Sequence, residues 1–199
     1  MKFTQIPTNT FSTLQLNAGI LIKGSTGFDP ATGTVTTDNL LGATTGGINA
    51  TCIPSFVDFG EDIDNCPKNT KELKKLDSWE CKIAATFVTV STTIAKLMLG
   101  AADIGATDTT KITPRVDLEP SDFEDVWFVC DYSDKNGATN GGFVAIHLMN
   151  ALSTAGFSLQ TTDKEKGQFS VEFTGHVSIA EQNVVPMEFY IKAGTAEPA

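Results

Sequence analysis

Apolar and polar residues alternate without a break along residues 168–179. Every odd position from Phe169 to Ile179 holds an apolar residue or glycine, and every even position from Ser170 to Ser178 holds a polar one. A period of two predicts a half-buried β-strand, with one face against a core and the other toward water or a partner. The polar face comprises Ser170, Glu172, Thr174, His176 and Ser178. Such a regular polar face indicates a surface with a function of its own.

Alternation or a short apolar run marks further strands along the chain. The predicted strands are residues 14–22, 52–59, 79–87, 126–132, 143–149, 155–161 and 185–191, with a short strand near 34–37. Residues 126–132 and 143–149 are apolar on both faces, so we expect two central strands that are covered on both sides. Between them, residues 134–137 contain Asn-Gly and are predicted to form a turn.

One segment has the spacing of an amphipathic helix, about residues 92–103. Ile94, Leu97, Met98 and Ala101 fall on one face, and Ser91 or Thr92 is placed to cap the N-terminus. Together, these patterns predict a mainly β fold. We expect an antiparallel β-sandwich or barrel of about seven to eight strands, with one flanking α-helix and long extended loops.

The 199 residues are predicted to form a single domain, 1–199. It would have an N-terminal arm at 1–13, a long Gly/Thr-rich loop at 24–51 and a C-terminal tail at 192–199. A loop longer than about 15 residues is usually functional or ordered by a partner. Because this loop lacks core-forming periodicity, deletion of residues 33–47 is expected to leave a folded subunit that stacks poorly.

The chain is acidic, with 24 acidic and 14 basic residues and a formal net charge of −10. This balance argues against electrostatic binding to nucleic acid, which needs clustered Lys and Arg. It allows a wall that nucleic acid passes without adhering. The sequence contains no apolar run of about 18 residues and no signal-peptide pattern, so we expect no membrane span and synthesis in the cytoplasm. The four cysteines are then expected to be reduced.

Candidate metal and catalytic groups lack the spacing that their chemistry requires. The acidic turn at 58–64 has neither the ligand ladder nor the central Gly of an EF-hand, and no C-x-x-C pair exists. We interpret Cys81 and Cys130 as small core residues, His147 as a core histidine and His176 as a surface contact. Neither histidine lies near a nucleophile motif. The sequence therefore predicts no catalytic residue, no cofactor and no metal site, and a protein that is not an enzyme.

Seven acids and no Lys or Arg occur between residues 117 and 134. They are Asp117, Glu119, Asp122, Glu124, Asp125, Asp131 and Asp134. One interpretation is a solvated edge that keeps the protein soluble, and the other is a surface that repels phosphate. The sequence leaves both open.

The order of elements resembles the major tail tube proteins of long-tailed bacteriophages and prophages. The matching segments are residues 16–21, 42–47, 58–65, 166–179 and 186–191. The resemblance covers most of the chain and contains no catalytic motif. It implies a β-sandwich with a flanking helix, assembled as hexameric rings that stack into a hollow tube. Related folds occur in contractile tails and in the tube of type VI secretion.

The resemblance implies a structural virion protein, the major subunit of a tail tube for DNA passage. Its partners would be further copies of itself and other tail proteins, such as the tape measure, tail tip and terminator. DNA would be only a transient, non-adhering cargo, and no membrane is involved. The expected location is the virion tail, after synthesis in the host bacterial cytoplasm. Alternatives are a tail terminator or secretion-tube subunit of the same fold, or a carbohydrate-binding β-sandwich module.

Two sets of residues are candidates for the surfaces of such a subunit. Subunit contacts are expected from Phe3, Gly42, Thr44, Gly46, Asp58, Glu61, Asp62 and Asp64. Lumen-facing positions are expected at Glu172, Thr174, His176, Asp122, Glu124 and Asp125.

Overall fold

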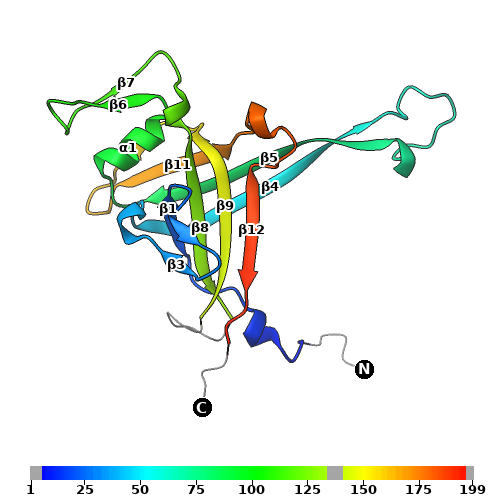
Figure 1. Cartoon of the computed structure of the whole chain (residues 1–199), viewed down its shortest axis with the longest axis horizontal. Helices are drawn as coiled ribbons and strands as arrows, with labels where there is room; N and C mark the ends of the chain where they lie inside the picture. Colours follow the sequence, from blue (N-terminus) through cyan, green and yellow to red (C-terminus); the bar gives the residue numbers. More distant parts are fainter. Residues whose placement is uncertain (1–5, 134–140, 196–199) are drawn as a thin grey trace.

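One eight-stranded antiparallel sheet organises the chain in the computed structural model, which describes residues 6–133 and 141–195 (Figure 1). Its strands are β1 (Ile20–Lys23), β4 (Thr44–Asp58), β5 (Lys74–Phe87), β8 (Glu124–Tyr132), β9 (Gly142–Ser153), β10 (Ser158–Gln160), β11 (Gln168–Gly175) and β12 (Met187–Lys192). Two small hairpins pair β2 (Phe28–Asp29) with β3 (Thr34–Val35), and β6 (Ala102–Ile104) with β7 (Ile112–Pro114). The predicted mainly β, antiparallel fold with one α-helix is confirmed.

Short 3₁₀ helices occupy several connections. They are Thr10–Thr13, Thr37–Asn39, Lys71–Leu73, Pro120–Asp122 and Ile179–Glu181.

Strand β9 belongs to two layers of the fold. One of its edges pairs with β8, while its other edge pairs first with β12, over residues 143–148, and then with β11, over residues 151–153. One layer is therefore β1-β8-β9-β12, and the other is β9-β11-β5-β4. In Figure 1 the strands β4, β5 and β11 cross the direction of β8, β9 and β12. This arrangement is β-sandwich-like.

A β-bulge in β9 lets the strand change partners. The register between β8 and β9 shifts where Asp125 lies opposite Met149 and Asn150, and Asn150 has a φ of 46°. Asn tolerates this left-handed conformation better than most residues. The Asp125 carboxylate accepts a hydrogen bond from the Asn150 backbone N–H at 2.9 Å, and the Asn150 side chain donates to the His176 carbonyl at 3.2 Å. These bonds hold the bend, since bulges leave backbone groups without ladder partners.

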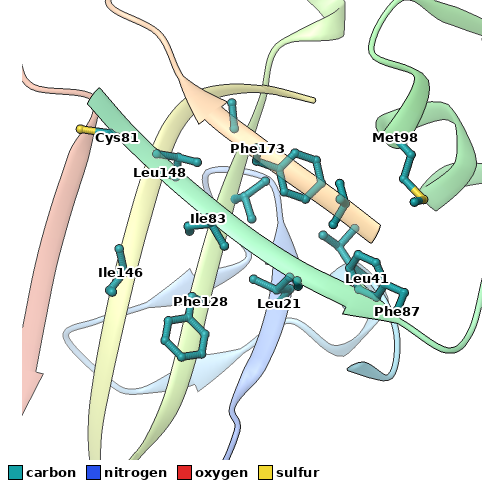
Figure 2. Close-up of a cluster of buried hydrophobic side chains, with 14 of the residues drawn as sticks. Leu21, Leu41, Cys81, Ile83, Phe87, Met98, Phe128, Ile146, Leu148 and Phe173 are labelled. Carbon is teal, nitrogen blue, oxygen red and sulfur yellow. The ribbon is translucent and has the colours of Figure 1, made fainter. Parts of the chain in front are cut away.

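The main core lies between the two layers (Figure 2). Its large side chains come from both layers and the helix, and they include Leu21, Phe128, Ile146, Leu148, Ile83, Phe87, Phe173 and Met98. Successive residues of β5 show the period of two, because Ile83 and Phe87 are fully buried while Lys82 and Thr86 are not. Burial of this apolar surface is the main source of stability.

A second, smaller core covers the other face of β8 and β9. The β2–β3 hairpin brings Phe28 against Trp127 and Phe143, with ring centroids 5.5 and 5.0 Å apart. Ile22, Val129 and Ala145 complete this cluster. The prediction that both strands are covered on two sides is confirmed.

The helix α1 (Thr92–Leu99) is shorter than predicted. Ser91 caps it, because its hydroxyl accepts a hydrogen bond from the Ile94 N–H at 3.2 Å, and Ile94 and Met98 are buried in the main core. Gly100 has a φ of 75°, which ends the helix, and strand β6 starts two residues later. The helix therefore does not reach residue 103.

Two predicted strands are too long. Of residues 14–22, only the last three belong to β1, because Asn17 and Gly19 have φ values of 62° and 72° and interrupt the extended chain. Strand β11 ends at Gly175 rather than at residue 179. A Cβ at that glycine would lie 2.7 Å from the Leu148 side chain, so the chain passes there in close contact with β9.

The prediction of a loop over residues 24–51 is wrong in its second half, which contains the start of a strand. Strand β4 begins at Thr44 and pairs with β5 from its first residue, and a register shift at Gly46 and Gly47 conceals the alternation. The first half is also part of the fold, because Phe28 and Leu41 are buried in the two cores. Deletion of 33–47 would therefore remove core and sheet residues, contrary to the expectation.

Smaller differences affect strand ends. The predicted strands 52–59 and 79–87 are the ends of two much longer strands, β4 and β5, while 155–161 reduces to β10 and 185–191 shifts to β12. The predicted turn at 134–137 lies outside the described residues.

Replacement of Phe87 by Ala should lower the free energy of unfolding by about 3–5 kcal/mol, since the ring is fully buried between the layers. Thr86→Ala is the matched control, because Thr86 lies on the opposite face, and it should change stability by less than about 0.5 kcal/mol. Urea unfolding followed by circular dichroism measures both. Similar losses in the two variants would contradict this assignment of faces.

Candidate functional site

The hairpin of β4 and β5 extends well beyond the body of the protein (Figure 1). The two strands pair from Thr44 with Phe87 to Asp58 with Lys74. We define the arm as residues 53–80, the part beyond the last core pair of Cys52 and Cys81. A two-stranded ribbon by itself is marginally stable in water.

The arm carries an apolar stripe that continues the core-facing side of the hairpin. Pro54 pairs with Trp79 and Phe56 pairs with Leu76. Phe56 is 53 % exposed and Trp79 is 39 % exposed, although both are large apolar side chains. Exposed apolar surface of this extent, grouped on one element, is typical of a protein-interaction surface. Along the chain, the exposed large apolar residues of the arm are Ile53, Phe56, Val57, Phe59, Ile63, Leu76 and Trp79.

The predicted acidic turn lies at the tip of the arm. Asp58 closes this tip, because its carboxylate accepts hydrogen bonds from the N–H groups of Gly60 and Asn69 at 2.9 and 3.2 Å. Glu61, Asp62 and Asp64 are exposed. Three of the four acids are therefore available to a partner, while Asp58 also maintains the local structure.

The second feature is an uncovered sheet face, which we call the open face. It consists of the outward side chains of β11, β5 and β4, namely Ser170, Glu172, Thr174, Glu80, Lys82, Thr86, Asn49 and Thr51. Lys82 lies 2.6 Å from Glu80 and 3.4 Å from Glu172, so one positive charge partly compensates two negative ones. The pKa of Lys82 is raised, first by its hydrogen bond to Glu80. The open face is hydrophilic and weakly charged.

Glu172 and Thr174, which the sequence placed in the lumen, lie side by side on the open face. Both residues are half-buried, and the Thr174 hydroxyl is 2.9 Å from the hydroxyl of the exposed Thr154. Neighbouring strands therefore contribute to one continuous polar surface.

The other predicted lumen residues do not join the open face. Asp122 is buried and forms an ion pair with Arg115, which also binds Asp103 and Glu119 at 3.0 and 2.9 Å. Asp122 also accepts a hydrogen bond from the Glu119 N–H at 2.8 Å. The expectation that Asp122 faces a lumen is therefore wrong, because this residue is buried and paired with Arg115. Arg115 lies two residues before the acid-rich stretch 117–134.

Asp125 belongs to a partly buried polar group around the buried His147. Its carboxylate lies 3.2 Å from Nε2 of His147, and Glu188 lies 3.6 Å from Nδ1. The imidazole stacks on the Trp127 ring at 4.0 Å, and the Tyr190 hydroxyl donates to Glu188 at 2.6 Å. The interpretation of His147 as a core histidine is confirmed, while Asp125 is not free to line a channel.

His176 and Glu124 also lie away from the open face. His176 follows the end of β11, where its Nδ1 lies 3.2 Å from the Asn150 carbonyl and its ring contacts Phe123. Glu124 begins β8 and is half-buried near Gly24. The polar face predicted from 168–179 therefore stops at Thr174, because the strand ends and the chain turns.

The predicted contacts near residue 44 lie together at the body end of the hairpin. Gly42 has a φ of 145°, and a Cβ there would lie 2.7 Å from the Thr89 hydroxyl. The structure of the subunit alone therefore favours glycine at this position. Thr44 pairs with Phe87, while Gly46 lies in the exposed bulge with nothing near its Cβ position. Phe3 lies outside the described residues.

The cysteines are all free thiols, and Cys81 and Cys130 are buried as predicted. Pairing of β4 with β5 also places Cys52 and Cys81 directly opposite each other, with 3.4 Å between their Sγ atoms. Spacing along the chain did not reveal this, because the two residues meet only through the hairpin register.

No family model matches the chain, and no curated protein matches it. Within residues 6–133 and 141–195, no group of three or more His, Cys, Asp or Glu is arranged to hold a metal ion. No helix in those ranges is long and apolar enough to cross a membrane.

Asp125→Asn should weaken the dependence of stability on acid pH. The hydrogen bond to His147 lowers the pKa of Asp125 below 3.8, so its ionised form stabilises the fold above that value. This contribution is lost as the pH falls through the folded-state pKa. Unfolding free energies of the wild type should therefore fall more steeply below about pH 4 than those of the variant.

Asp163→Asn is the control for this measurement, because its side chain is exposed on a loop. The variant should follow the wild-type pH profile. If the unfolding free energy of Asp125→Asn still fell as steeply in acid as that of the wild type, the role given to the Asp125–His147 contact would be contradicted.

Proposed function

We propose that this chain is a structural subunit that assembles with copies of itself into stacked hexameric rings, forming a hollow tail tube for DNA passage. The observation that carries the proposal is the arm, with its apolar stripe exposed to water. Large apolar side chains on a projecting ribbon gain stability when a second protein surface covers them. The resemblance to tail tube proteins supplies the identity of that surface, a second copy of this chain.

Unpaired strand edges support self-association. Among the described residues, β4 pairs only with β5, so the backbone groups on the outer edge of this 15-residue strand have no strand partner. Long exposed edges are templates for pairing with another chain. On β12, Phe189 and Ile191 are exposed beside such an edge and would offer apolar contact surface to a neighbour.

The open face fits the wall of the channel. Both faces of the β8–β9 region are covered, one by the main core and one by the second core, whereas the open face meets water. Hydroxyl groups and partly compensated charges offer little attraction to a phosphate backbone. We therefore assign Glu172 and Thr174 to the lumen, and Glu61, Asp62 and Asp64 at the arm tip to a contact between copies.

Purified protein should form tubes of stacked rings at high concentration or with a tail-tip complex, as seen by negative-stain microscopy. The protein should also occur in hundreds of copies in its virion, whereas a terminator would occupy about one ring. A protein that remains monomeric under these conditions and is absent from virions would contradict the proposal.

Phe56→Asp should weaken assembly without unfolding the subunit. Loss of one apolar anchor from an interface costs about 2 kcal/mol, so the concentration needed for tube formation should rise roughly 30-fold. Val116→Asp is the matched control, because Val116 is fully exposed near β7 and away from the arm. Light scattering measures assembly, and circular dichroism checks the fold. Equal effects in the two variants would show that the arm has no special role.

Glu80→Lys combined with Glu172→Lys should make assembled tubes bind duplex DNA, because the open face would become positive. The change should leave the fold intact, since exposed ion pairs contribute little stability. Co-sedimentation with DNA should be strong at low salt and weak at high salt. Asp163→Lys with Glu165→Lys carries the same charge change on a loop, and equal DNA retention in this control would contradict the lumen assignment.

A further inference from the structure

Cys52 and Cys81 face each other where the arm leaves the body of the protein. They are register partners on antiparallel strands, and their Sγ atoms are 3.4 Å apart. Facing residues in antiparallel strands have Cα atoms about 4.5–5.5 Å apart, which lies within the range of disulfide geometry. We propose that Cys52 and Cys81 form a reversible redox pair, closed into a cross-strand disulfide by thiol–disulfide exchange with a small-molecule disulfide.

The other two cysteines are not placed to compete for this bond. Cys66 lies at the tip of the arm, where its sulfur contacts Thr70. The stretch of β4 from Cys52 to Asp58 alone spans about 20 Å. Cys130 is buried on β8, and its thiol donates to the Val144 carbonyl. Among the described residues, Cys52 and Cys81 are the one pair of thiols at contact distance.

The two thiols differ in accessibility, which orders the reaction. Cys52 is partly exposed, whereas Cys81 is fully buried. The Cys52 thiolate attacks one sulfur of the external disulfide, forms a mixed disulfide and releases one small-molecule thiolate. Cys81 then loses its proton, and its thiolate attacks Sγ of Cys52 and displaces the second small-molecule thiolate. The two electrons removed from the cysteines thus reduce the external disulfide to two thiols.

The second step should limit the rate at neutral pH. In the reduced protein, burial and then the contact with the Cys52 thiol raise the pKa of Cys81 to about 12, and the burial remains once Cys52 is in the mixed disulfide. Because only the thiolate attacks, closure should accelerate about tenfold per pH unit below the pKa of Cys81 in the mixed disulfide. At lower pH the mixed disulfide on Cys52 should accumulate, because Cys81 then loses its proton too rarely to displace the small-molecule thiolate.

The bond would fix the register at the base of the arm. Cys52 and Cys81 lie between two irregularities of the hairpin, at Thr45/Ile48 and at Ser55/Phe56. A covalent link there prevents the strands from sliding past each other, since a slip of one residue would exchange the faces of every side chain. This chemistry belongs to the single subunit and does not depend on assembly.

Reduced full-length protein incubated with oxidised glutathione tests the proposal. The wild type should lose two of its four thiols and end two hydrogens lighter by mass spectrometry, with a peptide map that links Cys52 to Cys81. Dithiothreitol should restore both thiols. Closure followed between pH 7 and pH 9 should show the steep rise in rate.

Variants separate this pair from the remaining cysteines. Cys66→Ala/Cys130→Ala should still form the bond at the wild-type rate, whereas Cys52→Ser should leave Cys81 unmodified in the folded protein. The wild-type peptide map decides the question even if a variant fails to fold. Two free thiols retained at Cys52 and Cys81, or a link from Cys52 to Cys66 or to a second chain, would overturn the proposal.

Discussion

The fold depends on one bent strand. β9 pairs with β12 in its first half and with β11 at its end, and the bulge at Asn150 makes this exchange possible. Asp125 supplies the acceptor for the backbone N–H of Asn150 at the bulge, and His147 holds that carboxylate in its ionised form. Without the bend, the two layers would not face each other across the main core. A small polar network thus positions a large apolar interface.

The arm and the open face follow from the same hairpin. Side chains of β5 alternate between core and open face within the body, and beyond Cys81 the core-facing side continues as an exposed apolar stripe. The alternating side chains of this hairpin therefore lie in three environments: a buried core, a hydrophilic sheet face and an exposed apolar surface. For a subunit that assembles with its own copies, this arrangement places stability in the body and leaves the arm free for contact.

Net charge is a poor guide to the surface that DNA would meet. Of the acids between residues 117 and 134, Asp122 is buried against Arg115 and Asp125 lies beside His147. These two carboxylates stabilise the subunit and are not free to create a repulsive wall. The open face has partly compensated charges, so weak adhesion there would arise from hydroxyl groups and a low charge density rather than from strong repulsion.

The sequence by itself determined the fold class, the helix capped by Ser91 or Thr92 and the strands at the centre of the sheet, because these depend on local patterns. It also placed Glu172 and Thr174 on one polar face. Only the tertiary structure decided where β4 begins, which acids are neutralised and that Cys52 faces Cys81. The glycine bulge hides the alternation of β4, and the ion pairs and the thiol pair join residues that are distant along the chain or lie outside the acid-rich window. Contacts of this kind are set by strand register, which no local pattern contains.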